Sequence, residues 1–368
     1  MTDNGSTTDP AGRPAVETDV ESILSSALDA RGATAFAHVG PCRDPGIRYC
    51  ASAFDRLTVA ELEPAIYAIA YDGDEWLVRS SQEAAAHPAA RLADELSSRL
   101  GGTMLTFARI PHDAALHLEN GGFELASTDA IERARVTKTA DERGRIERAQ
   151  RAAQAGIQRA ASLLATATVD DGRLALDGET LSAATLRTEI DHAVLDAGAV
   201  PTSHTAVRTS TDSTTLRPGV PIVLAVAPRG PDGYHGGLVR TLVVDGEGGR
   251  ERRAHVAVTQ AFRSSRAMLT AGGASVTAVE ADLEAEIRAF GEDDAIETRV
   301  TGVGLEPRER PLAGDEQIEP GHVVRLEAAA RVADEQWIRI ADLLEVGDEG
   351  VEWLAPPPHS LEPANALE

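Results

Sequence analysis

Residues 218–245 read PGVPIVLAVAPRGPDGYHGGLVRTLVVD. Two apolar runs rich in β-branched residues, 222–227 and 238–244, flank a turn at 228–233 that contains Pro, Gly and Asp. Two such runs separated by turn residues predict a β-hairpin. Because successive residues of a strand point to opposite sides, alternate residues of each arm are expected to share one face of the hairpin.

The sequence of this hairpin resembles that of a known enzyme family. Gly-Tyr at 233–234, followed by Val-Arg-Thr at 239–241, is similar to the first metal-binding hairpin of the pita-bread metallopeptidases, which include aminopeptidase P, prolidase and methionine aminopeptidase. In that family each arm carries an aspartate that holds a metal pair. The matching positions here are Ala225 and Gly237, whose side chains offer no atom that binds a metal.

The remainder of the second part of the chain follows the plan of the same family. Thr139 and Glu142 form a capping box, in which each side chain accepts a hydrogen bond from the backbone N–H of the other residue. With residues 135–138, Arg-Val-Thr-Lys, this box is similar to the entry of the family's first long helix. Two halves of helix, helix and strand pair follow: 139–165, 180–197 and 222–244, then 251–271, 277–290 and 323–332 with 337–346.

The first part of the chain alternates short apolar strands with helices, which indicates an α/β domain. We therefore predict an α+β protein with an amino-terminal creatinase-like α/β domain at 19–130 and a pita-bread domain at 131–355. The polar start, 1–18, and the proline-rich end, 356–368, are expected to be disordered.

The resemblance implies five metal ligands, of which four are replaced. Two metal ions that share a hydroxide lower its pKa from about 15.7 toward 7 and polarise the carbonyl under attack. Besides the two hairpin aspartates, the family uses a loop histidine and one glutamate from each strand of the second pair. Thr301 stands in place of the histidine, Ala341 in place of the last glutamate, and Glu327 is retained.

Several neighbours are expected in the cleft on the basis of the resemblance. Arg240, Arg308 and Arg339 match cleft positions of the family, and we expect Glu327 to form a salt bridge with an arginine. His235 is expected near the cleft, on the same strand face as the missing aspartate. Asp342 follows Ala341 directly, so its side chain is expected to point away from the cleft.

A catalytic histidine is also usual in the family, upstream of the hairpin. No histidine occupies the matching position, near residue 209, and His204 is the nearest candidate. Creatinase resembles these peptidases in fold and works without metal, with a histidine as acid and base. The same chemistry here would require His204 to lie beside Glu327, within hydrogen-bond distance of a substrate.

Composition excludes some classes of partner. The 368 residues carry a formal net charge of −24, which argues against nucleic acid and anionic membranes. Lys138 is the only lysine, and an acidic surface almost without lysine is what a salt-adapted cytoplasmic protein would show. Cys42 and Cys50 are expected to be free thiols, and no stretch has the length of a membrane span or the pattern of a signal peptide.

These observations predict an Xaa-Pro aminopeptidase- or prolidase-like protein without metal cofactor and without peptidase activity, that is, a pseudoenzyme. It would bind a peptide, a small molecule or a partner, as a homodimer or as a dimer with an active paralogue. One alternative is an active Xaa-Pro metallopeptidase that holds Mn, Co or Zn with an unconventional ligand set. The other is a metal-free, creatinase-like hydrolase.

Overall fold

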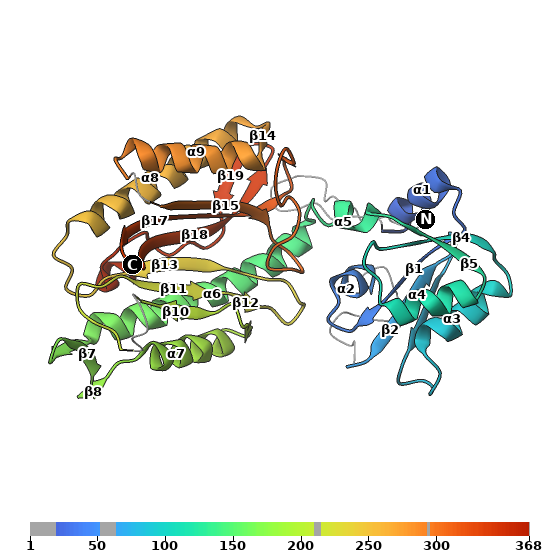
Figure 1. Ribbon diagram of the computed structural model, residues 1–368, viewed down its shortest axis with the longest axis horizontal. Helices are drawn as coiled ribbons and strands as arrows, with labels where there is room; N and C mark the ends of the chain where they lie inside the picture. Colours follow the sequence, from blue (N-terminus) through green and yellow to red (C-terminus); the bar gives the residue numbers. More distant parts are fainter. Residues whose placement is uncertain (1–19, 52–63, 210–214, 293–294, 368) are drawn as a thin grey trace, which may run out of the picture. The chain divides into compact units, whose positions relative to one another are not determined.

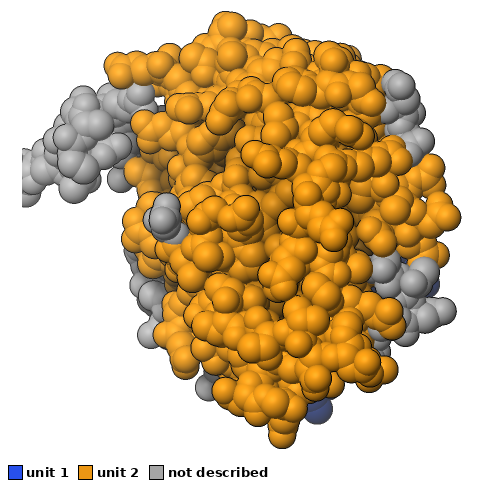
Figure 2. Space-filling model, turned by 90° about the vertical axis from the view of Figure 1, so that its left-hand side faces the viewer, with its two compact units in different colours: residues 1–135 blue, residues 136–368 orange. Residues whose placement is uncertain are grey.

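The computed structural model describes residues 20–51, 64–209, 215–292 and 295–367. The chain divides into two compact units, residues 1–135 and 136–368, which are coloured separately in Figure 2. The expected disordered start, 1–18, lies outside the described residues.

The first unit is a five-stranded sheet with helices. The strands lie in the order β3-β2-β1-β4-β5, in which β1 pairs in parallel with β4 and antiparallel with β2. Ala37, Leu92 and Leu118 are fully buried between the sheet and its helices. The elements are α1 (Val20–Arg31), β1 (Ala35–Pro41), α2 (Pro45–Ala51), β2 (Ile66–Tyr71), β3 (Trp76–Ser80), α3 (Pro88–Ser97), β4 (Gly102–Thr106), α4 (His112–Asn120), β5 (Phe123–Ser127) and α5 (Ala130–Ala134).

The second unit is built on a seven-stranded antiparallel sheet. Its strands follow the order β10-β11-β13-β18-β17-β15, and β19 pairs with β18. The expected hairpin of residues 222–244 is present as β11 and β13, and Val239 of β13 lies opposite Ala341 of β18. The strands are β10 (Ala206–Arg208), β11 (Ile222–Val226), β13 (Leu238–Leu242), β15 (Ile296–Gly302), β17 (Val323–Ala333), β18 (Gln336–Gly347) and β19 (Gly350–Trp353).

Four long helices cover one face of this sheet. Figure 1 shows α6 (Ala140–Thr166) and α7 (Ala183–Asp196) along β10 and β11, and α8 (Arg250–Ala271) and α9 (Val276–Ala289) along β15 and β17. Alternate strand residues such as Leu224 and Leu326 are fully buried against the helices. The residues between them therefore face the opposite side of the sheet.

The predicted duplication is present in the order of elements. Helices α6 and α7 precede the β11–β13 pair, and helices α8 and α9 precede the β17–β18 pair. The capping box that opens α6 is formed by both of its bonds, since Glu142 N donates to Thr139 Oγ1 and Thr139 N donates to Glu142 Oε2. The remaining short elements are β6 (Thr168–Asp170), β7 (Arg173–Leu176), β8 (Glu179–Thr180), β9 (Val200–Pro201), β12 (Pro228–Arg229), β14 (Ala274–Ser275), β16 (Gln317–Ile318) and η2 (Pro363–Ala366).

The carboxyl-terminal segment differs from the expectation of disorder at 356–368. Residues 356–367 are ordered on the helix-covered side of the sheet, where Ala366 is 1% exposed. Arg240 Nη2 donates to the carbonyl of Pro357, and His359 Nε2 lies 2.6 Å from Asp342 Oδ2. Arg240 and Asp342 are distant in sequence from Pro357 and His359, so the local composition of the segment could not predict these contacts.

Two smaller expectations can be compared with the structure. Cys42 and Cys50 are free thiols, as predicted. Among the helices that the structure describes, none combines the length and the apolar character needed to cross a membrane.

Candidate functional site

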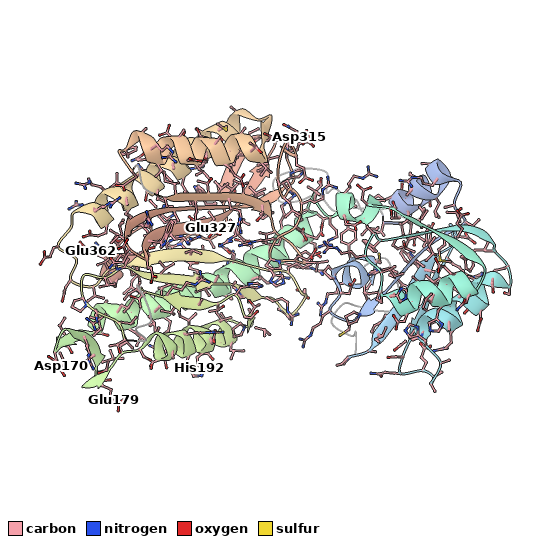
Figure 3. All side chains as sticks on the ribbon, viewed as in Figure 1. Asp170, Glu179, His192, Asp315, Glu327 and Glu362 are labelled. Carbon is pink, nitrogen blue, oxygen red and sulfur yellow. The ribbon has the colours of Figure 1, made fainter. Side chains whose placement is uncertain are left out.

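A cavity of about 960 Å³ opens on the face of the seven-stranded sheet that the helices leave uncovered. Strands β10, β11, β13, β15, β17 and β18 supply its walls, together with the loop at 303–308. In Figure 3 Glu327 lies over the middle of this sheet, whereas His192 lies on helix α7 at the outside of the unit. The cavity is therefore the cleft in which the sequence places its degenerate metal site.

The five positions expected to correspond to metal ligands share this face of the sheet. Ala225, Gly237 and Glu327 line the cavity directly. Ala341 lies opposite Glu327 in the β17–β18 pair and is fully buried beneath the cavity. Thr301 lies opposite Arg325 in the β15–β17 pair and is 4% exposed, but it does not line the cavity.

Glu327 is held by two guanidinium groups. Arg339 Nη1 donates to Glu327 Oε1 at 2.7 Å, and Arg325 Nη1 lies 2.7 Å from Oε2, close enough for an ion pair although not aligned for a hydrogen bond. Burial alone would raise the pKa of the Glu327 carboxyl. The positive charge of Arg325 and the hydrogen bond from Arg339 outweigh burial, so the pKa is lowered and the carboxylate stays ionised.

The side chain of Arg325 reaches across the floor of the cleft. A Cβ atom placed on Gly237 would lie 3.6 Å from Arg325 Nε and 3.9 Å from its Cδ. Arg325 extends from β17, and Gly237 precedes β13 on the other side of β18. The guanidinium thus lies between the retained Glu327 and the position where the family carries a hairpin aspartate.

These residues do not fit a pair of divalent metal ions. Only Glu327 among the five positions has a carboxylate or imidazole, the groups that such ions prefer. Both of its oxygens contact arginines, and the described residues hold no group of three or more His, Cys, Asp or Glu placed to bind a metal. The convergence of ligands that an unconventional metal site would need is thus missing from the part of the chain that the structure describes.

The other residues expected in the cleft divide into two groups. Arg308, Arg339 and His204 line the cavity. Arg240 and His235 do not, which corrects their placement in the cleft. Arg240 follows Val239, which lines the cavity, so the Arg240 side chain points to the helix-covered side of the sheet. His235 is 8% exposed, and its backbone N–H donates to the Gly304 carbonyl.

Arg240 pairs with the buried Asp342 and not with Glu327. Its Nη2 donates to Asp342 Oδ1 at 2.6 Å, and the side chains are 1% and 0% exposed. Burial raises the pKa of Asp342, but Arg240 and the hydrogen bond with His359 reverse the effect, so the pKa is lowered. Asp342 points away from the cleft, as predicted, and it cannot substitute for the glutamate that Ala341 replaces.

His204 lies apart from Glu327. His204 precedes the edge strand β10, and three strands, β11, β13 and β18, separate β10 from β17. His204 is exposed, and its backbone N–H donates to Thr202 Oγ1. No contact joins His204 to Glu327 among the described residues, and the carboxylate is already engaged by two arginines. The geometry therefore offers no acid–base pair of the creatinase type.

Three arginines of the cleft were not predicted: Arg208, Arg299 and Arg325. Arg325 could have been found, because it stands two residues before Glu327 on the same strand and so shares its face. Arg208 and Arg299 lie on strands β10 and β15, which the sequence did not indicate.

Comparison with known proteins gives a family for the second unit. The sequence model of metallopeptidase family M24 matches residues 144–348. A search of curated protein sequences finds no match.

Several solved structures share the fold over most of the chain. The prolidase from Pyrococcus furiosus is 17% identical, with 91% of this chain and 100% of that chain covered at a TM-score of 0.70. The Xaa-Pro dipeptidase from Bacillus anthracis is 16% identical, with coverages of 93% and 98% at a TM-score of 0.75. The amino-terminal domain of the FACT complex subunit SPT16 from chickpea, Cicer arietinum, is 14% identical, with coverages of 95% and 99% at a TM-score of 0.71. At these identities the likeness shows the fold alone.

Proposed function

Since the chain belongs to metallopeptidase family M24, we propose that it is a prolidase-like pita-bread protein that binds a ligand or partner in its cleft without metal and without peptide hydrolysis. One observation carries the proposal: both oxygens of the Glu327 carboxylate contact guanidinium groups, those of Arg325 and Arg339. The charge that metal ions would neutralise in a relative is neutralised here by the protein itself.

Electrostatics favours this assignment. Two unit charges 4 Å apart interact by about 4 kcal/mol at an effective dielectric constant of 20, so each guanidinium at that distance would repel a divalent ion by about twice as much. A metal ion near Glu327 would face Arg325 and Arg339 together, and the Glu327 carboxylate that would attract the ion is already paired with both of them. The positions at Ala225, Gly237 and Ala341 add no attraction, because their side chains carry no lone pair.

The proposal includes a partner and a place of action. The chain acts as a homodimer, or as a dimer with an active paralogue, and works in the cytoplasm. One neighbour in fold, SPT16, is named as a subunit of a complex rather than as a peptidase. The same fold therefore serves in at least one assembly whose name states no hydrolytic reaction. Light scattering of the purified chain is expected to give twice the 38.7 kDa of one chain.

Metal analysis with a peptidase assay tests the proposal. The protein is purified after growth with Mn, Co and Zn, its metal content is measured by mass spectrometry, and Xaa-Pro dipeptides are offered with an active prolidase as positive control. We expect well under one metal equivalent per chain and no turnover above buffer. About two equivalents of metal together with turnover would overturn the proposal.

A restored ligand sharpens the test. Gly237→Asp returns one carboxylate to the hairpin, and the added Cβ has room because its nearest neighbour is Arg325 Nε at 3.6 Å. We expect the new aspartate to form an ion pair with Arg325 and to recruit no metal. Stoichiometric metal binding by this variant would show that the arginine does not block the site.

A further inference from the structure

The lining of the cleft is positive although the protein is strongly acidic. Among the residues that the structure describes, three glutamates and five arginines line the cavity, so these side chains carry two more positive than negative charges, whereas the chain as a whole carries −24. Because clefts with low-dielectric walls focus the field of the charges that line them, an anion is drawn to this part of the surface.

Three of the cavity arginines are free to meet a ligand. Arg325 and Arg339 are engaged by Glu327, whereas Arg208, Arg299 and Arg308 are exposed, and their side chains form no ion pair or hydrogen bond with any described residue. Of these three, Arg299 and Arg308 lie at the Glu327 end of the cleft. Partial burial and the charges of Arg299 and Arg325 lower the pKa of Arg308. An anion placed between the guanidinium groups of Arg299 and Arg308 would reduce the repulsion between them.

An apolar floor adjoins the arginines. Val223, Val239 and Ala341 pack together, with Ala225 partly buried against them. Along one row of the sheet, Ala225 lies opposite Val239, Val239 opposite Ala341, and Ala341 opposite Glu327. The cleft thus presents an apolar surface at one end of this row and guanidinium groups at the other.

We propose that the cleft binds a small organic anion, a carboxylate or phosphate monoester attached to an apolar body. The apolar part would lie on Val223, Ala225 and Val239, and the anionic group would contact Arg299 and Arg308. Planar guanidinium groups bind both kinds of anion through paired hydrogen bonds. A cavity of about 960 Å³ has the size of known small-molecule sites. This assignment rests on the proposed function, in which the cleft binds without catalysing.

Calorimetric titration with four probes tests both parts of the site. Phenyl phosphate and benzoate carry an anion and an apolar ring, inorganic phosphate carries the anion alone, and benzyl alcohol carries the ring alone. We expect saturable binding of phenyl phosphate or benzoate, whichever anion the site prefers, at least about tenfold tighter than inorganic phosphate, and no binding of benzyl alcohol. Binding should be unchanged by a chelator, because no metal bridges the anion.

Matched variants locate the binding. Arg299→Ala and Arg308→Ala should each weaken binding about tenfold, the loss expected for one charge-assisted hydrogen bond. Arg288→Ala removes the same charge from helix α9, where Arg288 pairs with Glu284 outside the cleft, and should leave affinity unchanged. Neither Arg299 nor Arg308 forms an ion pair within the part of the chain that the structure describes, so both variants should unfold at the denaturant midpoint of the parent protein.

The outcomes separate the two proposals. No saturable binding of phenyl phosphate or benzoate would overturn the assignment of the ligand, as would equal losses in Arg308→Ala and Arg288→Ala. Inorganic phosphate binding as tightly as phenyl phosphate would refute the role of the apolar floor. Stoichiometric metal with Xaa-Pro turnover in the same preparation would refute the proposed function instead, whatever the anions do.

Discussion

Replacing Glu327 by glutamine tests whether this carboxylate is part of the protein's structure. Glutamine keeps the size of the side chain and an oxygen that can accept from Arg339 Nη1. It removes the negative charge and turns an amide donor toward Arg325, whose Nη1 lies 2.7 Å from Oε2 in the parent protein. Arg325 then loses the carboxylate with which it pairs, whereas Arg339 keeps its ion pair with Glu297.

The exposure of the three side chains sets the size of the effect. Glu327 is 12% exposed, Arg325 15% and Arg339 21%, so the cluster is neither fully buried nor on the open surface. Exposed ion pairs contribute about 0–1 kcal/mol and removal of one partner from a buried pair costs about 3–5 kcal/mol, so Glu327→Gln should lower the free energy of unfolding by about 2 kcal/mol.

Urea unfolding followed by circular dichroism measures this change. Glu297→Gln is the matched control, because Glu297 also pairs with Arg339 but is 56% exposed, and it should lose at most about 1 kcal/mol. A chelator should change neither the stability of the parent protein nor that of the variant. The reasoning is refuted if Glu327→Gln is as stable as the parent, or if the chelator destabilises the parent but not the variant, as a metal ligand would require.

Three further predictions concern stability. Asp342→Asn should lower the free energy of unfolding by about 3–5 kcal/mol in urea titrations, because Arg240 would be left buried without its charged partner; a loss under about 1 kcal/mol would contradict this. Burial lowers the pKa of His255, with smaller contributions from the nearby positive groups, and burial with the charge of Lys138 lowers that of His322, each to about 4. Between pH 6.5 and pH 4 these histidines are therefore protonated in the unfolded chain but not in the folded chain. The free energy of unfolding should be highest above pH 6.5 and should fall toward pH 4 by up to about 3 kcal/mol for each histidine. Equal stability at pH 7 and pH 5 would show that the two histidines titrate normally. Molar KCl shortens the Debye length to about 3 Å and screens the net charge of −24, so the melting temperature should rise from low to molar salt, and a fall would argue against salt adaptation.

Local patterns predicted the framework of the second unit. The capping box at Thr139 and Glu142 opens α6 with both of its hydrogen bonds, and the apolar runs around 228–233 form the hairpin. Strand alternation placed Asp342 correctly on the face opposite Glu327. These features depend on neighbours within a few residues, which a single sequence displays.

Alternation also exposes the errors in the cleft. Arg240 lies an odd number of residues after Gly237, so counting along the strand would have moved it to the helix-covered face. Arg325 lies two residues before Glu327 on β17, so counting along that strand would have placed Arg325 in the cleft. Arg299 could not have been placed, because the mixed polar and apolar residues of β15, 296–302, gave no strand pattern that stood out.

The ordered carboxyl-terminal segment has a consequence for synthesis of the chain. His359 and the carbonyl of Pro357 supply hydrogen bonds to the buried Asp342 and Arg240. A nascent chain that has not yet released residues 357–359 from the ribosome leaves both charged groups short of partners. The second unit can therefore complete its native structure only after residues 357–359 have emerged, although most of its sheet is available earlier.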